Sequence, residues 1–255
     1  MPRNLFDVAG KIVLITGAGR GLGAAFAAGF AEQGARVVVN DIDSEAAALS
    51  AERIGQAGGS AVAYAFDVTD ATAVDESVAR IEGEVGPIDV VINNAGIHRR
   101  APLAEMSLES WQAVIDVNLT GVFIVAQAVA RRMIGRKRGV IINISSLNSE
   151  GARPTIANYC AAKGGITMLT QSMALEWGKD NIRANAIGPG YFITDMTRSL
   201  AETPSFDAWV KQSVPLARWG DPSELIGTAI FLASDASSYI TGRTIYVDGG
   251  WRAGL

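Results

Sequence analysis

A tyrosine and a lysine stand four residues apart, at Tyr159 and Lys163, shortly after a serine pair that ends at Ser146. If this stretch is helical, the two side chains share one face. A phenol with a pKa of about 10 is a poor base at neutral pH. An ammonium about 4 Å away would stabilise the phenolate by roughly 4 kcal/mol at an effective dielectric of 20, and would lower its pKa by up to about three units. The spacing predicts a proton-transfer device, although a solvated helix face has the same spacing.

A glycine-rich turn with Gly17, Gly21 and Gly23 follows the first apolar run and precedes an alanine-rich segment. Glycines let the backbone approach a pyrophosphate, and the N-terminus of the following helix offers free N–H groups. Asp41 ends the next β-branched run, where a carboxylate accepts hydrogen bonds from ribose hydroxyls and repels a 2′-phosphate. The pattern predicts a dinucleotide site that favours NAD over NADP. Arg20 is a counter-signal, because it could reach a phosphate.

The elements that would position these residues alternate along the chain. Short apolar runs are expected strands at 12–16, 36–40, 61–66, 89–92, 140–144, 183–187 and 244–247, and helical stretches separate them at 23–33, 44–56, 71–84, 107–133, 156–177 and 222–232. The runs are continuously apolar rather than alternating, as expected for strands that are covered on both faces. We predict one α/β domain over residues 1–255, with a doubly wound parallel seven-stranded sheet and helices on both faces.

One region departs from this rhythm. Residues 188–220 carry Pro189, Pro204 and Pro215, with Phe192, Phe206, Trp209 and Trp219 among them, and show no clear strand. A long insertion after a late strand predicts a lid over a ligand site at about 190–220, the alternative being a packed surface excursion.

The composition is that of a globular protein, with 49% apolar residues, 19% charged residues and a net charge of −4. This charge gives no support for nucleic-acid binding, and the basic run 131–138 is expected to end a helix. No apolar stretch resembles a signal peptide or a membrane span, so we expect a soluble, cytoplasmic protein with no membrane partner. A single cysteine, Cys160, excludes an intramolecular disulfide, and with a single histidine, His98, we expect no metal site.

Several motifs together resemble the short-chain dehydrogenase/reductase family. They are Thr16-Gly17-x-x-x-Gly21-x-Gly23, Asp67-Val68, Asn93-Asn94-Ala95-Gly96, Asn118 in Val-Asn-Leu-Thr, Tyr159-x-x-x-Lys163 with Ser146 upstream, and Pro189-Gly190 followed by Thr194. They span residues 16–194, and Val247-Asp248-Gly249-Gly250 fits the family's C-terminal strand. The resemblance implies a Rossmann-like fold, a nicotinamide cofactor and a homotetramer.

The resemblance also implies roles for single residues. Tyr159 would accept the alcohol proton while hydride moves to the nicotinamide, and Ser146 would hold the substrate oxygen. Lys163 would also hold the cofactor ribose, and Asn118 would position a water. The cofactor-binding residues, by resemblance and by the glycine-turn argument, are Gly17, Arg20, Gly21, Leu22, Gly23, Asp41, Asp67, Val68, Asn94, Ala95, Gly96, Tyr159, Lys163, Pro189, Gly190, Phe192 and Thr194.

Within the family, the stretches 94–100, 148–153, 189–192 and 218–222 resemble gluconate 5-dehydrogenases. Arg99 or Arg100 could pair with a sugar-acid carboxylate, and the resemblance favours Arg100. The other substrate candidates are Ser146, Asn148, Glu150, Arg153 and Tyr191, with Trp209 helping to close the lid. Charged loop residues are mostly exposed. For each candidate except Arg100, a surface position without contact to substrate therefore explains the residue as well as a binding role does.

The sequence thus predicts an NAD(P)-dependent oxidoreductase that transfers hydride between the cofactor and a secondary alcohol or ketone of a sugar acid, such as gluconate and 5-ketogluconate. One alternative is a reductase of 3-oxoacyl thioesters or other ketones. Another is a non-catalytic NAD-sensing protein, which would have little need for Ser146, Tyr159 and Lys163 together.

Overall fold

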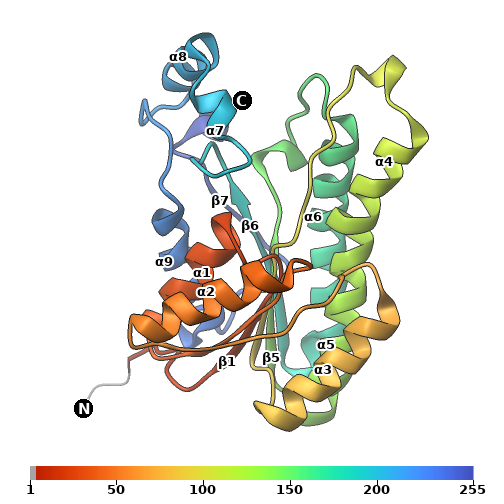
Figure 1. Cartoon of the computed structure of the whole chain (residues 1–255), viewed down its shortest axis with the longest axis vertical. Helices are drawn as coiled ribbons and strands as arrows, with labels where there is room; N and C mark the ends of the chain where they lie inside the picture. The colour runs from red at the N-terminus through yellow and green to blue at the C-terminus, as the bar shows by residue number, and fades with distance from the viewer. Residues whose placement is uncertain (1–3, 255) are drawn as a thin grey trace.

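A seven-stranded parallel sheet lies between two layers of helices in the computed structural model, which describes residues 4–254 (Figure 1). The strands are β1 Ile12–Ile15, β2 Arg36–Val39, β3 Ser60–Ala63, β4 Val90–Asn93, β5 Gly139–Ile144, β6 Ile182–Pro189 and β7 Thr244–Val247. Their order is β3-β2-β1-β4-β5-β6-β7, and every neighbouring pair is parallel. The predicted fold class is confirmed. The order reverses between β1 and β4, the place where such sheets bind ligands.

Helices cover both faces of the sheet. One layer holds α1 Gly21–Glu32, α2 Ser44–Gln56 and α9 Ile226–Ala233. The other holds α3 Ala71–Glu84, α5 Gly121–Arg136 and α6 Ala157–Trp177, with α4 Leu108–Ile115 packed on α6. Alternate residues of β1 show why its sequence is wholly apolar. Val13 and Ile15 pack in one hydrophobic cluster, whereas Ile12 and Leu14 pack in the other.

The helix expected at 107–133 extends further, to Arg136, and its regular α-helical hydrogen bonding is interrupted once. Between α4 and α5 the chain makes a π-helical turn at Asp116–Thr120, and the helical stretch ends at Arg136, within the basic run. This stretch, Leu108–Arg136, has the length and apolar content of a membrane span, but half of its apolar window is buried inside the protein. A core helix passes the same test, so the stretch is weak evidence for a membrane.

The segment after β6 forms a small unit above the carboxyl ends of the strands (Figure 1). It contains the short helices α7 Arg198–Ala201 and α8 Pro204–Ser213. Its own apolar cluster contains Val210, Val214 and Trp219, with Tyr191, Leu200, Ala201, Phe206, Trp209 and Trp251 packed against them. Because this cluster is separate from the two main ones, the segment can hold its shape without being part of the sheet's core.

Candidate active site

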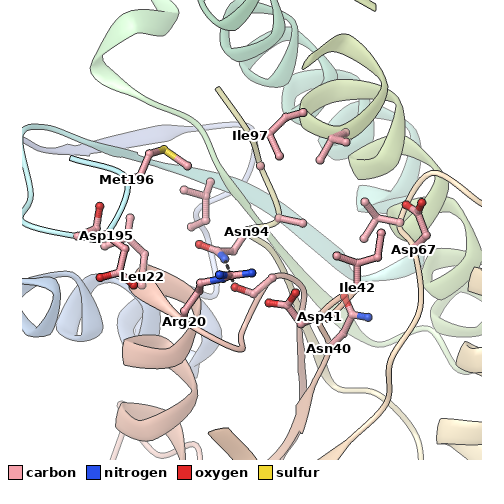
Figure 2. Close-up of a pocket in the computed structure, with 18 of the residues that line it drawn as sticks. Arg20, Leu22, Asn40, Asp41, Ile42, Asp67, Asn94, Ile97, Asp195 and Met196 are labelled. Atoms are coloured by element: carbon pink, nitrogen blue, oxygen red, sulfur yellow. Dashed lines mark hydrogen bonds between the residues drawn. The ribbon is translucent and has the colours of Figure 1, made fainter. Parts of the chain in front are cut away.

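A cavity of about 390 Å³ opens at the carboxyl ends of the strands, where the strand order reverses (Figure 2). Most of the predicted cofactor residues line it: Gly17, Arg20, Gly21, Leu22, Asp41, Asp67, Val68, Asn94, Ala95, Gly96, Tyr159, Lys163 and Thr194. Gly23, Pro189, Gly190 and Phe192 are not part of its wall. Gly23 instead packs against the carbonyl of Gly17, where a Cβ would lie only 2.2 Å from that oxygen.

The glycine turn is built for close approach. Gly17 and Gly21 have φ values of 62° and 57°, which favour glycine. A Cβ on Gly17 would lie 2.8 Å from the Cα of Ala95, whereas a Cβ on Gly21 would meet no atom within 4 Å. Helix α1 begins here without a side-chain cap, so its first N–H groups remain available to an anion.

Asp41 is held at the edge of the cavity by the backbone around it. Its carboxylate accepts hydrogen bonds from the N–H of Gly19 at 3.0 Å and from that of Asp43 at 3.1 Å. The exposed guanidinium of Arg20 lies 3.8 Å from the carboxylate of Asp43. A fixed carboxylate beside an uncapped helix N-terminus is the donor and acceptor set that a nicotinamide dinucleotide needs, so these residues fit that cofactor.

Asn94 has a structural contact that the sequence did not reveal. Its Nδ2 donates to the carbonyls of Thr16 and Gly17, both at 2.9 Å, and its backbone N–H donates to the Thr16 hydroxyl at 3.0 Å. Asn94 therefore ties the end of β4 to the glycine turn while it lines the cavity.

Tyr159 and Lys163 both line the cavity, one turn apart on α6. The Lys163 Nζ is buried, donates to the carbonyl of Ile144 at 2.6 Å and lies 5.6 Å from the centroid of the Tyr159 ring. Ser146 is buried just beyond β5 and hydrogen-bonds with the Tyr159 phenol. The three predicted residues are thus brought together, although Ser146 and Tyr159 belong to different elements.

The electrostatics differ from the expectation. Burial raises the pKa of Tyr159 above the usual phenol value. The hydrogen bond with Ser146 and the charge of Arg100 lower this pKa, but they offset only part of the effect of burial. Burial lowers the pKa of Lys163 to about 8. The prediction that Lys163 lowers the Tyr159 pKa, by up to about three units, is wrong for the protein alone. Lys163 is directed to a backbone carbonyl rather than to the phenol oxygen, and the dense surroundings penalise both charged forms.

Asn118 lies in the π-helical turn and is fully buried. Its Oδ1 accepts the N–H of Ile97 at 2.8 Å and its Nδ2 donates to the carbonyl of Ile97 at 3.0 Å. The π-turn turns this side chain toward the loop after β4, and such turns are frequent at functional sites. Its side chain fixes the loop at Ile97, and its role with a water stays a prediction.

His98 follows Ile97 and lies on the ring of Tyr159, with centroids 3.9 Å apart and planes 24° apart. Burial, and then the charges of Arg100 and Lys163, lower the pKa of His98 to about 4, so the imidazole is neutral near pH 7. This stacking could not be predicted from the sequence, because residues 98 and 159 are far apart in the chain.

The two candidate arginines differ in their surroundings. The Arg99 guanidinium lies 3.6 Å from the carboxylate of the exposed Glu109. Arg100 has no hydrogen bond or ion pair with any residue of 4–254, and its charge acts on Tyr159, His98 and Tyr191. Arg100 is therefore the free cation near the proposed catalytic tyrosine.

Other substrate candidates already have partners. The Arg153 guanidinium lies 4.0 Å from the ring centroid of Trp209 and donates to the Tyr191 hydroxyl. Glu150 accepts from the Tyr246 hydroxyl at 2.8 Å and from Arg252. The Oδ1 of Asn148, in contrast, is buried without a partner among the described residues. Arg153 and Glu150 are thus tied to the lid segment and the C-terminal segment, and their contact with substrate stays a prediction.

Sequence reasoning missed eight wall residues, most of them apolar: Ile42, Phe66, Ile97, Val117, Ile144 and Met196, as well as Asn40 and Asp195. The one available signal was adjacency, since Ile42 follows Asp41 and is 70% exposed, and Asp195 and Met196 follow Thr194. Figure 2 shows Asp195 and Met196 on one side of the cavity and Ile42 and Asp67 on another. Within residues 4–254, no cluster of three histidine, cysteine or carboxylate side chains could hold a metal ion.

The fold, the glycine turn and the Ser146–Tyr159–Lys163 arrangement define a nicotinamide-dependent oxidoreductase. A profile of the family described as Enoyl-(Acyl carrier protein) reductase matches residues 17–252. The chain belongs to this family of short-chain dehydrogenase/reductases, as its motifs predicted.

The similar proteins include enzymes that are named for sugar acids. The chain is 49% identical over 247 residues to a 5-keto-D-gluconate 5-reductase of Escherichia coli (strain K12), which covers 97% of both chains. It is similar to a crystal structure of a gluconate 5-dehydrogenase from Burkholderia cenocepacia J2315 in complex with NADP and tartrate, at a TM-score of 0.96 and 47% identity over 98% of each chain. It is also 45% identical to a 3-oxoacyl-[acyl-carrier-protein] reductase of a Synechocystis species, over 94% of this chain and 96% of the relative.

Proposed function

We propose that this enzyme interconverts a secondary alcohol and a ketone on a sugar acid, with gluconate and 5-ketogluconate as the first candidates and NAD favoured over NADP. The observation that carries the proposal is the charge of Arg100, which has no hydrogen bond or ion pair within residues 4–254 and acts electrostatically on Tyr159, because a carboxylate substrate needs such a cation. Similarity to a 5-keto-D-gluconate 5-reductase supports the same substrate class.

The chain's own residues would remove the proton from the substrate alcohol and orient the substrate. Bound in the cavity, the oxidised cofactor would supply the hydride acceptor, with Asp41 at the ribose, the N-terminus of α1 at the pyrophosphate, and Tyr159 and Lys163 at the nicotinamide end. Ser146 would hold the carbinol oxygen, and Tyr159 would take its proton. Because burial raises the pKa of Tyr159, positive charge added nearby would favour the loss of the phenol's own proton.

Two further features belong to this proposal. We expect the segment 190–220 to act as a lid, because Asp195 and Met196 reach the cavity from it and its aromatic cluster is separate from the main core. We also expect a homotetramer in the cytoplasm, since Phe123, Met168 and Leu175 on α5 and α6 are exposed apolar side chains that a partner would cover. Light scattering of the purified protein measures the assembly.

The rival within the family is reduction of a 3-oxoacyl thioester, which the Synechocystis relative's name indicates for that protein. A largely apolar cavity wall would suit it, whereas Arg100 favours a carboxylate. The rival of another class is an NAD sensor without turnover.

A single assay separates these functions. Purified protein is incubated with NAD or NADP and a panel of sugar acids, fatty alcohols and steroid alcohols, and the reduced cofactor is followed by absorbance. Turnover of sugar acids is the expected result, and turnover of only the apolar alcohols would remove the sugar-acid proposal. Replacement Tyr159→Phe should abolish turnover and leave cofactor affinity within about threefold, because it removes only the proton acceptor. If the variant lost both properties equally, Tyr159 would not be the proton acceptor.

A further inference from the structure

The contact between His98 and Tyr159 has no part in the proposed proton transfer. The imidazole lies flat on the phenol ring, at 3.9 Å between centroids. Because Tyr159 must meet the reacting oxygen of the substrate, a ring stacked on it lies behind the cavity wall close to that oxygen, next to the wall residue Ile97.

Two buried asparagines fix His98 in this place. Asn118 holds the N–H and the carbonyl of Ile97, the residue before His98. Asn158 Nδ2 donates to the carbonyl of Arg99, the residue after it, at 3.0 Å. Both asparagine side chains are fully buried, so the backbone on either side of His98 is held from the protein interior. A side chain held this firmly can discriminate between substrates.

The imidazole also has an unused hydrogen-bonding group. Its Nδ1 is buried and has no partner within residues 4–254. Buried polar groups are normally paired, and an unpaired one costs about 1–3 kcal/mol. A neutral imidazole carries one donor and one acceptor nitrogen, so either can bind a hydroxyl, which is itself both donor and acceptor.

We propose that His98 determines specificity by hydrogen-bonding a hydroxyl on the carbon next to the reacting carbon, so that the enzyme selects vicinal diols and the matching α-hydroxy ketones. The proposal rests on the proposed function for the role of Tyr159. Hydroxyls on adjacent carbons of a sugar acid lie about as far apart as two stacked rings. If Tyr159 binds the reacting oxygen, the imidazole of His98 is therefore placed to bind the hydroxyl on the next carbon.

The test compares substrates that differ in a single hydroxyl. For the wild-type enzyme, kcat/KM is measured with gluconate and with its 4-deoxy and 6-deoxy analogues. We expect kcat/KM for gluconate to exceed that for one of the analogues by about 10–100-fold, because that analogue leaves a buried polar group of the enzyme unpaired. His98→Phe keeps an aromatic ring against Tyr159 but removes both nitrogens, and it should reduce this ratio to about threefold or less. His98→Gln keeps a hydrogen-bonding group without the ring and should retain part of the ratio.

The control is Tyr64→Phe, which removes a hydroxyl that is bonded to Glu84, neither residue lining the cavity, and should leave the ratio unchanged. An unchanged ratio in His98→Phe would overturn the role of His98. If the wild type oxidises other alcohols but no sugar acid, the sugar-acid function fails separately, and the same comparison with 2,3-butanediol and 2-butanol decides the role of His98. No turnover of any alcohol would overturn both proposals.

Discussion

Lys163 Nζ donates a hydrogen bond of 2.6 Å to the carbonyl oxygen of Ile144, the last residue of β5. The strand that leads to Ser146 is thereby joined to the helix that carries Tyr159. This contact, rather than a direct contact with the phenol oxygen, places the lysine beside the tyrosine ring. Its burial explains why the pKa of Lys163 falls to about 8.

The charge of Lys163 should limit activity at alkaline pH. Below its pKa of about 8 the amine is protonated and stabilises a phenolate on Tyr159, and above it this charge is lost. We expect kcat/KM for alcohol oxidation, which reports the free enzyme, to decline above about pH 8. Replacement Lys163→Met should lower kcat at least about 100-fold below pH 8 and by less above it, where the wild-type amine has also lost its charge. A profile that stays flat to pH 10 would contradict this role.

His98 should make stability depend on pH in the acid range. Its folded pKa of about 4 lies below the unfolded value of about 6.5, so between these values the unfolded chain binds more protons. The unfolding free energy should then fall as pH drops from 6.5 to 4, by at most about 1.4 kcal/mol per pH unit, and by less because the side chain is partly exposed. Urea unfolding of wild type and His98→Gln over this range measures the difference. Parallel slopes for the two proteins would exclude a lowered pKa.

Arg100 should bind the carboxylate of the substrate. Replacement Arg100→Gln should raise KM for a sugar acid about 10–100-fold and change KM for a neutral polyol by less than about threefold, because only the acid carries the charge. The matched control is Arg99→Gln, whose wild-type side chain is exposed and lies near Glu109. Equal effects at both positions would indicate a general loss of positive potential instead of a specific contact.

Asp41 should set the cofactor preference. Replacement Asp41→Ser removes the charge that would repel a 2′-phosphate, so the ratio of kcat/KM for NADP to that for NAD should rise at least about tenfold. Arg20→Gln should change the ratio in the opposite direction if Arg20 reaches the phosphate. A wild-type enzyme that already prefers NADP, as bound in the Burkholderia structure, would overturn the NAD preference.

The C-terminal strand should help to position Ser146. The Ser149 hydroxyl donates to the Ser146 carbonyl at 2.8 Å and can accept from the Tyr246 hydroxyl, which lies 2.9 Å from it and 2.8 Å from a Glu150 carboxylate oxygen. We expect Tyr246→Phe and Ser149→Ala each to lower kcat about 5–20-fold with cofactor affinity unchanged, the size of one lost hydrogen bond that acts through Ser146. The double variant should be no worse than either single one, because both act through the same contact. If the double variant loses kcat by the product of the two single losses, Tyr246 and Ser149 act independently and the proposed link through Ser146 is wrong.

Much of the fold was predictable because its signal is local. Apolar runs such as 36–40 and 140–144 predicted β2 and β5 closely, since a strand that is buried on both faces is apolar at most positions; Asn143 is an exception in β5. The boundaries of α2 and α3 also matched, because Asp43 and Asp70 cap their first turns. The π-turn at Asp116–Thr120 was not predictable, since no residue type marks it.

By itself the sequence determined the class of chemistry, because the glycine turn, Asp41 and the Tyr159–Lys163 pair each depend on short spacings along one element. Only the tertiary structure decided the environment of those groups. It placed Lys163 against Ile144, His98 on Tyr159, and Glu150 against Arg252, and these pairs join segments that are distant in the chain. The pKa of a side chain depends on what surrounds it in space, so a spacing could predict that Tyr159 and Lys163 meet but not that burial would outweigh their attraction.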